Sequence, residues 1–160
     1  MRFTSLALIL AAAAFLCTTP GCRQDSPASP PLALAEPVKS VLNQYLTIQA
    51  GLAGDSIQGL DEQAKAIATA VRGDAAKTFS PDVAAQAEAL AQAKDLKAAR
   101  AAFKPLSASL VKYMSDNKAG KGTYHEVYCP MAEASWLQTG KDIRNPYYGK
   151  EMLDCGEMKN

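Results

Sequence analysis

The chain has 160 residues, with 17 basic and 16 acidic side chains and a formal net charge of +1 at neutral pH. This balance, without any basic stripe, argues against nucleic acid as a partner. The length is that of one domain of ordinary size, which can bury a modest core.

The first 21 residues are typical of a bacterial signal peptide. Arg2 supplies a positive start, and an unbroken apolar stretch follows over residues 6–16. Such a stretch suits the central part of a signal peptide and is too short to span a bilayer as a helix. No other apolar run in the sequence approaches transmembrane length. We therefore expect residues 1–21 to direct export and then to be removed.

The stretch at residues 19–22, Thr-Pro-Gly-Cys, resembles the lipobox of bacterial lipoproteins. Gly21 matches that pattern, whereas Thr19 departs from the preferred Leu. The resemblance implies that Cys22 is acylated and becomes the first residue of a membrane-anchored protein. Because Arg23 rather than Asp follows, it also implies the periplasmic side of the outer membrane in an envelope with two membranes. Simple secretion with an unmodified Cys22 is the alternative.

Residues 22–35 are rich in Pro, Ser and Ala, a composition typical of a flexible tether. We expect a single domain over residues 36–160. Its first part, residues 36–118, is rich in Ala and carries four apolar stripes at helical spacing. Together these features predict a mainly α fold, an antiparallel four-helix bundle followed by an irregular C-terminal segment with a short strand.

Start signals precede each of the four predicted helices. Pro37 suits the first turn of the first helix, and Asp55 with Gln58 forms a capping-box pattern before the second. Ser80 precedes a Pro at the third, and Asp95 is a candidate cap for the fourth. We expect the apolar faces of these helices to form the core and assign them no chemistry.

The segment 119–160 has a different character. It contains the only His and the only Trp, both Cys residues that follow Cys22, and three of the five Met residues. Aromatic and β-branched residues before Pro130 favour a strand. A helical turn is expected around Trp136, and Asn145 before a Pro is a turn signal.

This segment carries a resemblance to a known family. The stretches that carry it are Tyr-Cys-Pro-Met at 128–131, Trp-Leu at 136–137, Ile-Arg-Asn-Pro-Tyr-Tyr-Gly at 143–149 and Met-Leu-Asp-Cys-Gly-Glu at 152–157. They resemble small periplasmic domains of unknown function, found alone or fused to periplasmic adaptor subunits of copper and silver efflux pumps. The resemblance extends over roughly residues 36–160 and implies that the protein handles copper or silver.

The chemistry of the same residues is compatible with a soft-metal site. Cu(I) and Ag(I) select thiolate and thioether ligands. Cys129 and Met131 share one face of an extended chain, and Met152 and Cys155 align if they occupy a helical turn. His125 lies on the same strand face as Cys129. The predicted ligands are therefore Cys129, Met131, Met152, Cys155 and His125.

Each of these residues also has a structural interpretation. Cys129 and Cys155 can form a disulfide, since thiols outside the cytoplasm often do. Met131 and Met152 can fill core space, and His125 can serve as a hydrogen-bonded structural residue. Trp136 is expected to anchor the segment to the helices, and Met158 is expected to be frayed and exposed because it lies near the C-terminus.

No pattern typical of an enzyme is present. The single His lacks a recognisable nucleophile beside it, and no glycine-rich phosphate loop is found. Two hypotheses follow. The first is a lipid-anchored periplasmic copper- or silver-binding protein that acts in metal tolerance or delivers the metal to an efflux complex. The second is a metal-free interaction module of an envelope complex, stapled by a disulfide.

Overall fold

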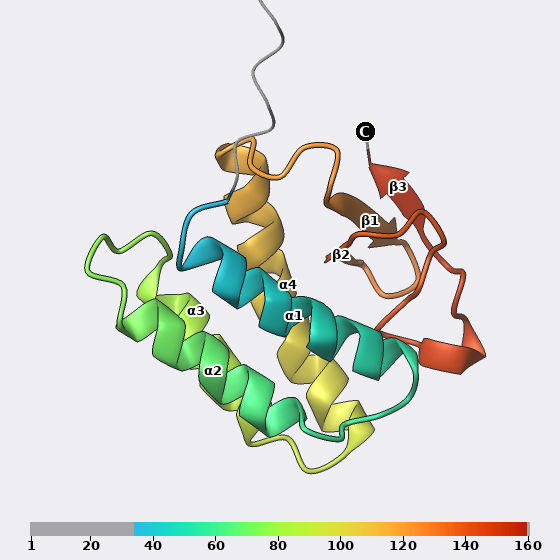
Figure 1. The fold of residues 1–160 in the computed structure, drawn as a ribbon. Helices are drawn as coiled ribbons and strands as arrows, with labels where there is room; N and C mark the ends of the chain where they lie inside the picture. The colour runs from blue at the N-terminus through green and yellow to red at the C-terminus, as the bar shows by residue number, and fades with distance from the viewer. Residues whose placement is uncertain (1–33, 160) are drawn as a thin grey trace, which may run out of the picture.

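The computed structural model describes residues 34–159 and shows a mainly helical chain that ends in a small sheet (Figure 1). The helices are α1 (Val38–Ala53), α2 (Leu60–Arg72), α3 (Pro81–Ala91) and α4 (Leu96–Asp116). The C-terminal part contains β1 (His125–Cys129), β2 (Ala134–Gln138), the short 3-10 helix η1 (Gly149–Glu151) and β3 (Glu157–Lys159). The predicted signal peptide, Cys22 and nearly all of the tether lie outside the described residues. Within the described part, none of the helices combines the length and the apolar character needed to cross a membrane.

Two of the four helix starts are capped as the sequence predicts. The Ser80 hydroxyl accepts a hydrogen bond from the Asp82 backbone N–H at the start of α3. The Asp95 carboxylate accepts one from the Ala98 N–H, at 2.8 Å, at the start of α4. Each cap satisfies a backbone donor that has no partner inside its helix.

The predicted start of the second helix is wrong. Helix α2 begins at Leu60, after Gly59 in the left-handed conformation, and no side chain caps it. Asp55 itself has a φ of 61°, and its carboxylate binds the guanidinium of Arg100 on α4. The capping-box pattern matched by spacing alone, whereas a distant arginine determines where this carboxylate lies.

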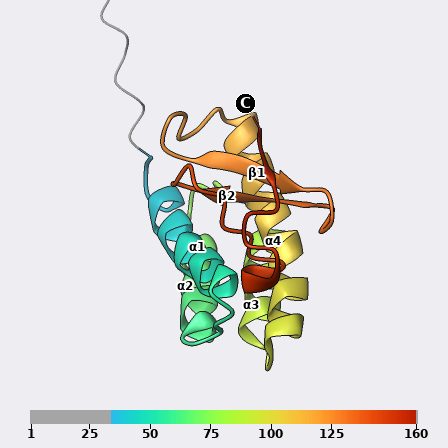
Figure 2. The same ribbon diagram turned by 90° about the vertical axis from the view of Figure 1, so that its right-hand side faces the viewer.

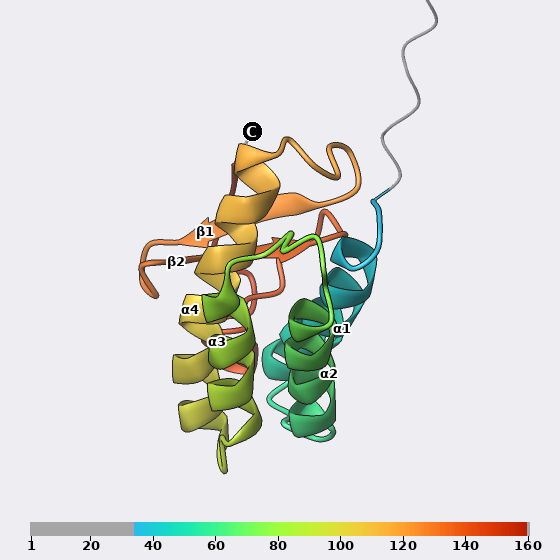
Figure 3. The ribbon, with the colours of Figure 1, turned by 90° about the vertical axis from the view of Figure 1, so that its left-hand side faces the viewer.

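Consecutive helices pack against each other, so that α1 contacts α2, α2 contacts α3 and α3 contacts α4. Helices α1 and α4 contact each other little, and both contact β2. Figure 3 shows α1 with α2 on one side, α3 with α4 on the other, and the sheet across one end. The largest fully buried side chains come from both parts of the chain: Trp136, Tyr45, Phe103, Leu42, Leu52, Ile67, Leu90, Leu106, Leu110, Val41, Val83 and Val127.

The sheet is antiparallel, with the strand order β2-β1-β3. Strand β1 confirms the strand predicted before Pro130, but the helical turn predicted around Trp136 is wrong. Trp136 pairs with Val127 in the β1–β2 ladder, and Met158 pairs with the same residue from β3. Met158 is therefore held in a strand and half-buried rather than frayed.

Hydroxyl groups join the outer edge of β2 to the helices. The Leu137 N–H donates to the Tyr45 hydroxyl of α1, which lies 2.7 Å from the Ser107 hydroxyl of α4. Ser107 and Tyr147 both donate to the Ser135 carbonyl oxygen. These bonds satisfy buried backbone groups that an edge strand would otherwise leave unpaired.

The C-terminal segment covers the face of the sheet that carries the Trp136 side chain. The Tyr147 ring meets the fully buried Trp136 ring edge-on, with centroids 5.9 Å apart. Trp136 also belongs to the same buried core as the helices, as an anchor for this segment should. A side chain at Gly156 would meet the Trp136 and Val127 side chains, so the backbone there passes directly over the sheet. Figure 2 shows this segment, in red, running from the sheet to η1 between α1 and α4.

Candidate functional site: the Cys129–Cys155 pair

The fold brings two distant cysteines together. Cys129 is the last residue of β1 and is fully buried, whereas Cys155 lies between η1 and β3 and is partly exposed. Their Sγ atoms are 2.8 Å apart, and both side chains are thiols. The prediction that these two residues converge is therefore confirmed.

Hydrogen-bond donors surround the Cys129 sulfur. The hairpin turn that follows β1 directs the backbone N–H groups of Ala132 and Met131 at it, and the Asn145 side chain adds another donor. Burial by itself raises the pKa of the Cys129 thiol, but these donors and the Cys155 thiol outweigh burial, so its pKa falls below the usual range. In the reduced pair, Cys129 is the preferred site for a thiolate.

The pKa of the partner thiol, Cys155, shifts in the opposite direction. The hydrogen bond between the two thiols raises the pKa of Cys155, and partial burial raises it further. The two pKa values move apart because removing the second proton would place two negative charges side by side. Cys129 therefore loses its proton at a lower pH than Cys155.

Asn145 organises the chain around the pair and is itself fully buried. Its side-chain N–H group donates to the Cys155 carbonyl oxygen at 2.8 Å, and its Oδ1 atom accepts from the Tyr147 and Tyr148 N–H groups. Its backbone N–H donates to the Leu153 carbonyl oxygen at 2.7 Å. These contacts fix the turn that holds Cys155 against Cys129.

The other predicted ligands are placed differently. Met131 is 62 % exposed at the hairpin turn, the one large hydrophobic side chain that is exposed among residues 34–159. Met152 is half-buried, and its carbonyl oxygen accepts from the Cys155 N–H at 3.1 Å. His125 stands at the other end of β1, opposite Gln138. Four residues of strand separate it from Cys129 by about 13 Å, so the two do not form one site.

No group of three or more His, Cys, Asp or Glu side chains suited to hold a metal ion occurs in the part of the chain that the structure describes. Tetrahedral zinc sites require such a group. Two adjacent sulfur donors instead fit a soft monovalent ion, which prefers thiolates.

Arg100 fixes the η1 side of the segment to the helical body. Its guanidinium binds the Asp55 carboxylate and donates to the Leu52 and Pro146 carbonyl oxygens. Gly149, with a φ of 58°, lies so close that an added Cβ atom would overlap the Asp55 and Arg100 side chains. Sequence reasoning missed both Arg100 and the role of Asn145, since Asn145 presents only as a turn signal and nothing marks Arg100.

A family model described as "Protein of unknown function (DUF3347)" matches residues 41–122, about half of the chain. The chain belongs to this DUF3347 family. The match covers nearly all of the helical part and ends before β1, so it identifies the helices and leaves the cysteine pair outside. No curated protein and no solved structure matches the chain. The expected membership of a family of unknown function is thereby confirmed, while the link to copper and silver efflux stays a prediction.

Proposed function

We propose that this protein is a lipid-anchored periplasmic protein that binds one soft monovalent ion, Cu(I) or Ag(I), through Cys129 and Cys155. The observation that carries the proposal is the contact between the two Sγ atoms, at 2.8 Å, beside N–H groups that favour a thiolate. A thiolate is the form in which cysteine binds metal, and a site that already favours it loses less free energy to deprotonation.

The location of the pair supports capture and release. Cys129 is fully buried, while Cys155 is partly exposed and Met131 is at the surface of the adjoining turn. An ion held by the two sulfurs would be shielded from water on the Cys129 side and accessible from the Cys155 side. This asymmetry suits a protein that takes up an ion for metal tolerance or delivers it to an efflux partner, as the C-terminal resemblance implies.

The lipid anchor is proposed on the sequence of residues 1–22, with acylation of Cys22. Fatty-acid labelling in the producing bacterium tests it. Label is expected in the wild-type protein and absent from Cys22→Ala, which is also expected to remain unprocessed. Labelled Cys22→Ala, or unlabelled wild type of mature mass, would contradict the anchor.

A second candidate is the disulfide-stapled, metal-free interaction module. The sulfur contact favours this candidate too, because two adjacent thiols can pass two electrons and two protons to a disulfide of an oxidising exchange partner. The resulting bond would close the loop between β1 and β3 and stabilise the fold by about 2–4 kcal/mol.

Protein isolated from cells grown in copper distinguishes the two candidates. Trapping with a thiol reagent under denaturing conditions, followed by mass spectrometry, reports the state of both cysteines. The proposal predicts two alkylated cysteines and one equivalent of copper before denaturation. A quantitative disulfide that resists mild reductants, without copper, would favour the staple.

A further inference from the structure

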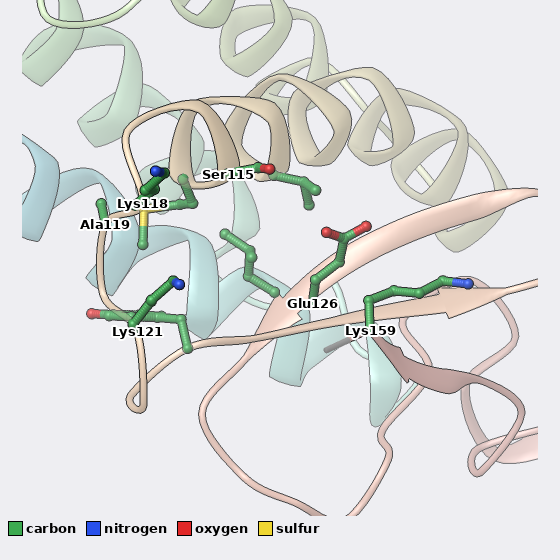
Figure 4. A pocket seen from close by; sticks show the side chains of 10 residues that line it. Ser115, Lys118, Ala119, Lys121, Glu126 and Lys159 are labelled. Carbon is green, nitrogen blue, oxygen red and sulfur yellow. The ribbon is translucent and has the colours of Figure 1, made fainter.

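A pocket of about 320 Å³ opens where α4 ends, between that end of the helix and the sheet (Figure 4). Its apolar lining comes mainly from Val111 and Met114 of α4 and from Leu137 of β2. Three lysines line it as well, Lys118, Lys121 and Lys159, against one acidic residue, Glu126. The pocket is separate from the cysteine pair, since neither Cys129 nor Cys155 contributes to its lining. It combines an apolar surface with an excess of positive charge.

The loop after α4, which lines one end of this pocket with Lys118, Ala119 and Lys121, carries backbone donors of its own. Lys118, Gly120 and Gly122 have φ values of 50°, 64° and 82°, so left-handed residues recur through the loop. No acceptor among the described residues binds the N–H groups of Gly120, Lys121 and Gly122. Successive N–H groups in such a backbone form concavities that bind anions.

The charges are divided between the two ends of the pocket. Figure 4 shows Lys118 and Lys121 at one end, with Glu126 and Lys159 at the other. Glu126 accepts a hydrogen bond from the Ser135 hydroxyl, and the Lys159 ammonium group lies 4.8 Å from the centre of the Tyr128 ring. Within residues 34–159, neither Lys118 nor Lys121 forms an ion pair. An anion is therefore favoured at the Lys118 and Lys121 end.

This end of the molecule is also where the described chain begins. Figures 1 and 3 both show the start of α1 at the same end as the loop after α4. About a dozen residues separate Leu34 from Cys22, the predicted site of the lipid. A lipid on Cys22 would hold the pocket near the membrane surface, where anionic headgroups attract lysines.

We propose that this pocket binds the phosphate group of an anionic phospholipid, with Lys118, Lys121 and the Gly120–Gly122 N–H groups as donors. The glycerol and upper acyl carbons would then lie against Val111 and Met114. This contact would orient the domain on the bilayer and leave the Cys155 region accessible to a partner. The inference rests on the proposed anchor only for the source of the lipid, and it does not depend on metal binding.

The test uses short-chain lipids below their micelle concentration, so that binding is measured whether or not Cys22 is acylated. Backbone amide NMR spectra of the full mature chain are recorded with dihexanoylphosphatidylglycerol, dihexanoylphosphatidylcholine and inorganic phosphate. We expect saturable shifts at Gly120, Lys121 and Gly122 with phosphatidylglycerol. We expect much weaker binding of phosphatidylcholine and of phosphate.

A double variant and a matched control complete the test. Lys118→Ala with Lys121→Ala should weaken phosphatidylglycerol binding about thirtyfold, since each lysine contributes about fivefold near an anionic lipid. Lys94→Ala with Lys97→Ala removes two exposed lysines at the other end of α4, about 30 Å away, and should change nothing. Binding of phosphate as tight as that of phosphatidylglycerol would overturn the lipid assignment. Equal binding of both lipids would overturn the preference for an anionic lipid, and an unaffected Lys118/Lys121 variant would overturn the site itself.

Discussion

The buried Asn145 side chain donates a hydrogen bond to the Cys155 carbonyl oxygen at 2.8 Å, and the same side chain reaches the Cys129 sulfur. One amide thus connects both members of the cysteine pair. Because Asn145 also accepts from two backbone N–H groups, it couples the geometry of the turn to the charge on the sulfur.

Replacing Asn145 by Ala should therefore affect both stability and thiol chemistry. The substitution leaves buried backbone groups without partners, at a cost of about 1–3 kcal/mol for each such group. It also removes a donor to the Cys129 sulfur, so we expect slower alkylation of Cys129 at neutral pH. Urea unfolding and quantitative alkylation measure the two effects. Asn117→Ala is the control, since Asn117 is exposed and bonds only the Tyr113 carbonyl oxygen. Equal losses for both variants would refute the role of Asn145.

The two thiols should titrate in different ranges. The donors around Cys129 lower its pKa, so its thiolate persists to lower pH than that of an ordinary thiol. The pKa of Cys155 is raised by its hydrogen bond to Cys129, so it ionises only at higher pH. Alkylation rates measured against pH, with Cys129→Ser and Cys155→Ser to assign each thiol, test this in the reduced protein. In each single variant the surviving thiol should move toward the ordinary value. A single midpoint shared by both cysteines of the wild type would show that the pair is not coupled.

A pair of glycine variants tests how tightly the C-terminal segment is held. Gly149 and Gly122 both have positive φ values, of 58° and 82°, and a side chain at either costs about 1–2 kcal/mol of backbone strain. At Gly149 the new Cβ atom would also overlap Asp55 and Arg100, whereas nothing lies within 4 Å at Gly122. Gly149→Ala should therefore lower the free energy of unfolding clearly more than Gly122→Ala. Equal values in urea unfolding would mean that η1 is not fixed by the Asp55–Arg100 pair.

The Asp55–Arg100 pair should also make the stability of the fold depend on pH. The hydrogen bond from Arg100 lowers the pKa of Asp55 below its ordinary value of 3.8. Because this pKa is lower in the folded than in the unfolded state, the stabilisation is fully present above pH 3.8 and is lost as pH falls through the lower folded value. Asp55→Asn should be destabilised relative to wild type at pH 7, and the difference should shrink in acid. Asp61→Asn, which breaks an exposed pair with Lys65, should show a smaller effect. A difference that stays constant with pH would contradict the assignment.

The sequence predicted the helices better than the surroundings of the cysteines, for physical reasons. A stripe such as Leu60, Ala64 and Ile67 shows the period of a helix directly. The strand β2 was missed because Ala-Ser-Trp-Leu-Gln has no β-branched residue and becomes a strand through its pairing with β1. The role of Asp55 was mistaken because a local spacing matched a cap while its partner, Arg100, lies 45 residues away.

The candidate site, too, could be predicted from the sequence only in part. Convergence of Cys129 and Cys155 was predictable because a disulfide and a shared metal ion both require it. Grouping His125 with Cys129 failed because two residues on one strand face can still be far apart along the strand. The amide donors to the Cys129 sulfur were not predictable, since they depend on how the turn after β1 folds.

A competition titration shows whether Cys129 and Cys155 together hold one Cu(I) or Ag(I) ion. The reduced protein is titrated with Cu(I) under nitrogen against a chromogenic chelator, beside Cys129→Ser/Cys155→Ser and the control Met158→Ala. We expect one tightly bound ion for the wild type and for Met158→Ala, an affinity that weakens as pH falls, and no tight binding by the double variant. A double variant that competes as well as the wild type would show that the two cysteines do not form the binding site.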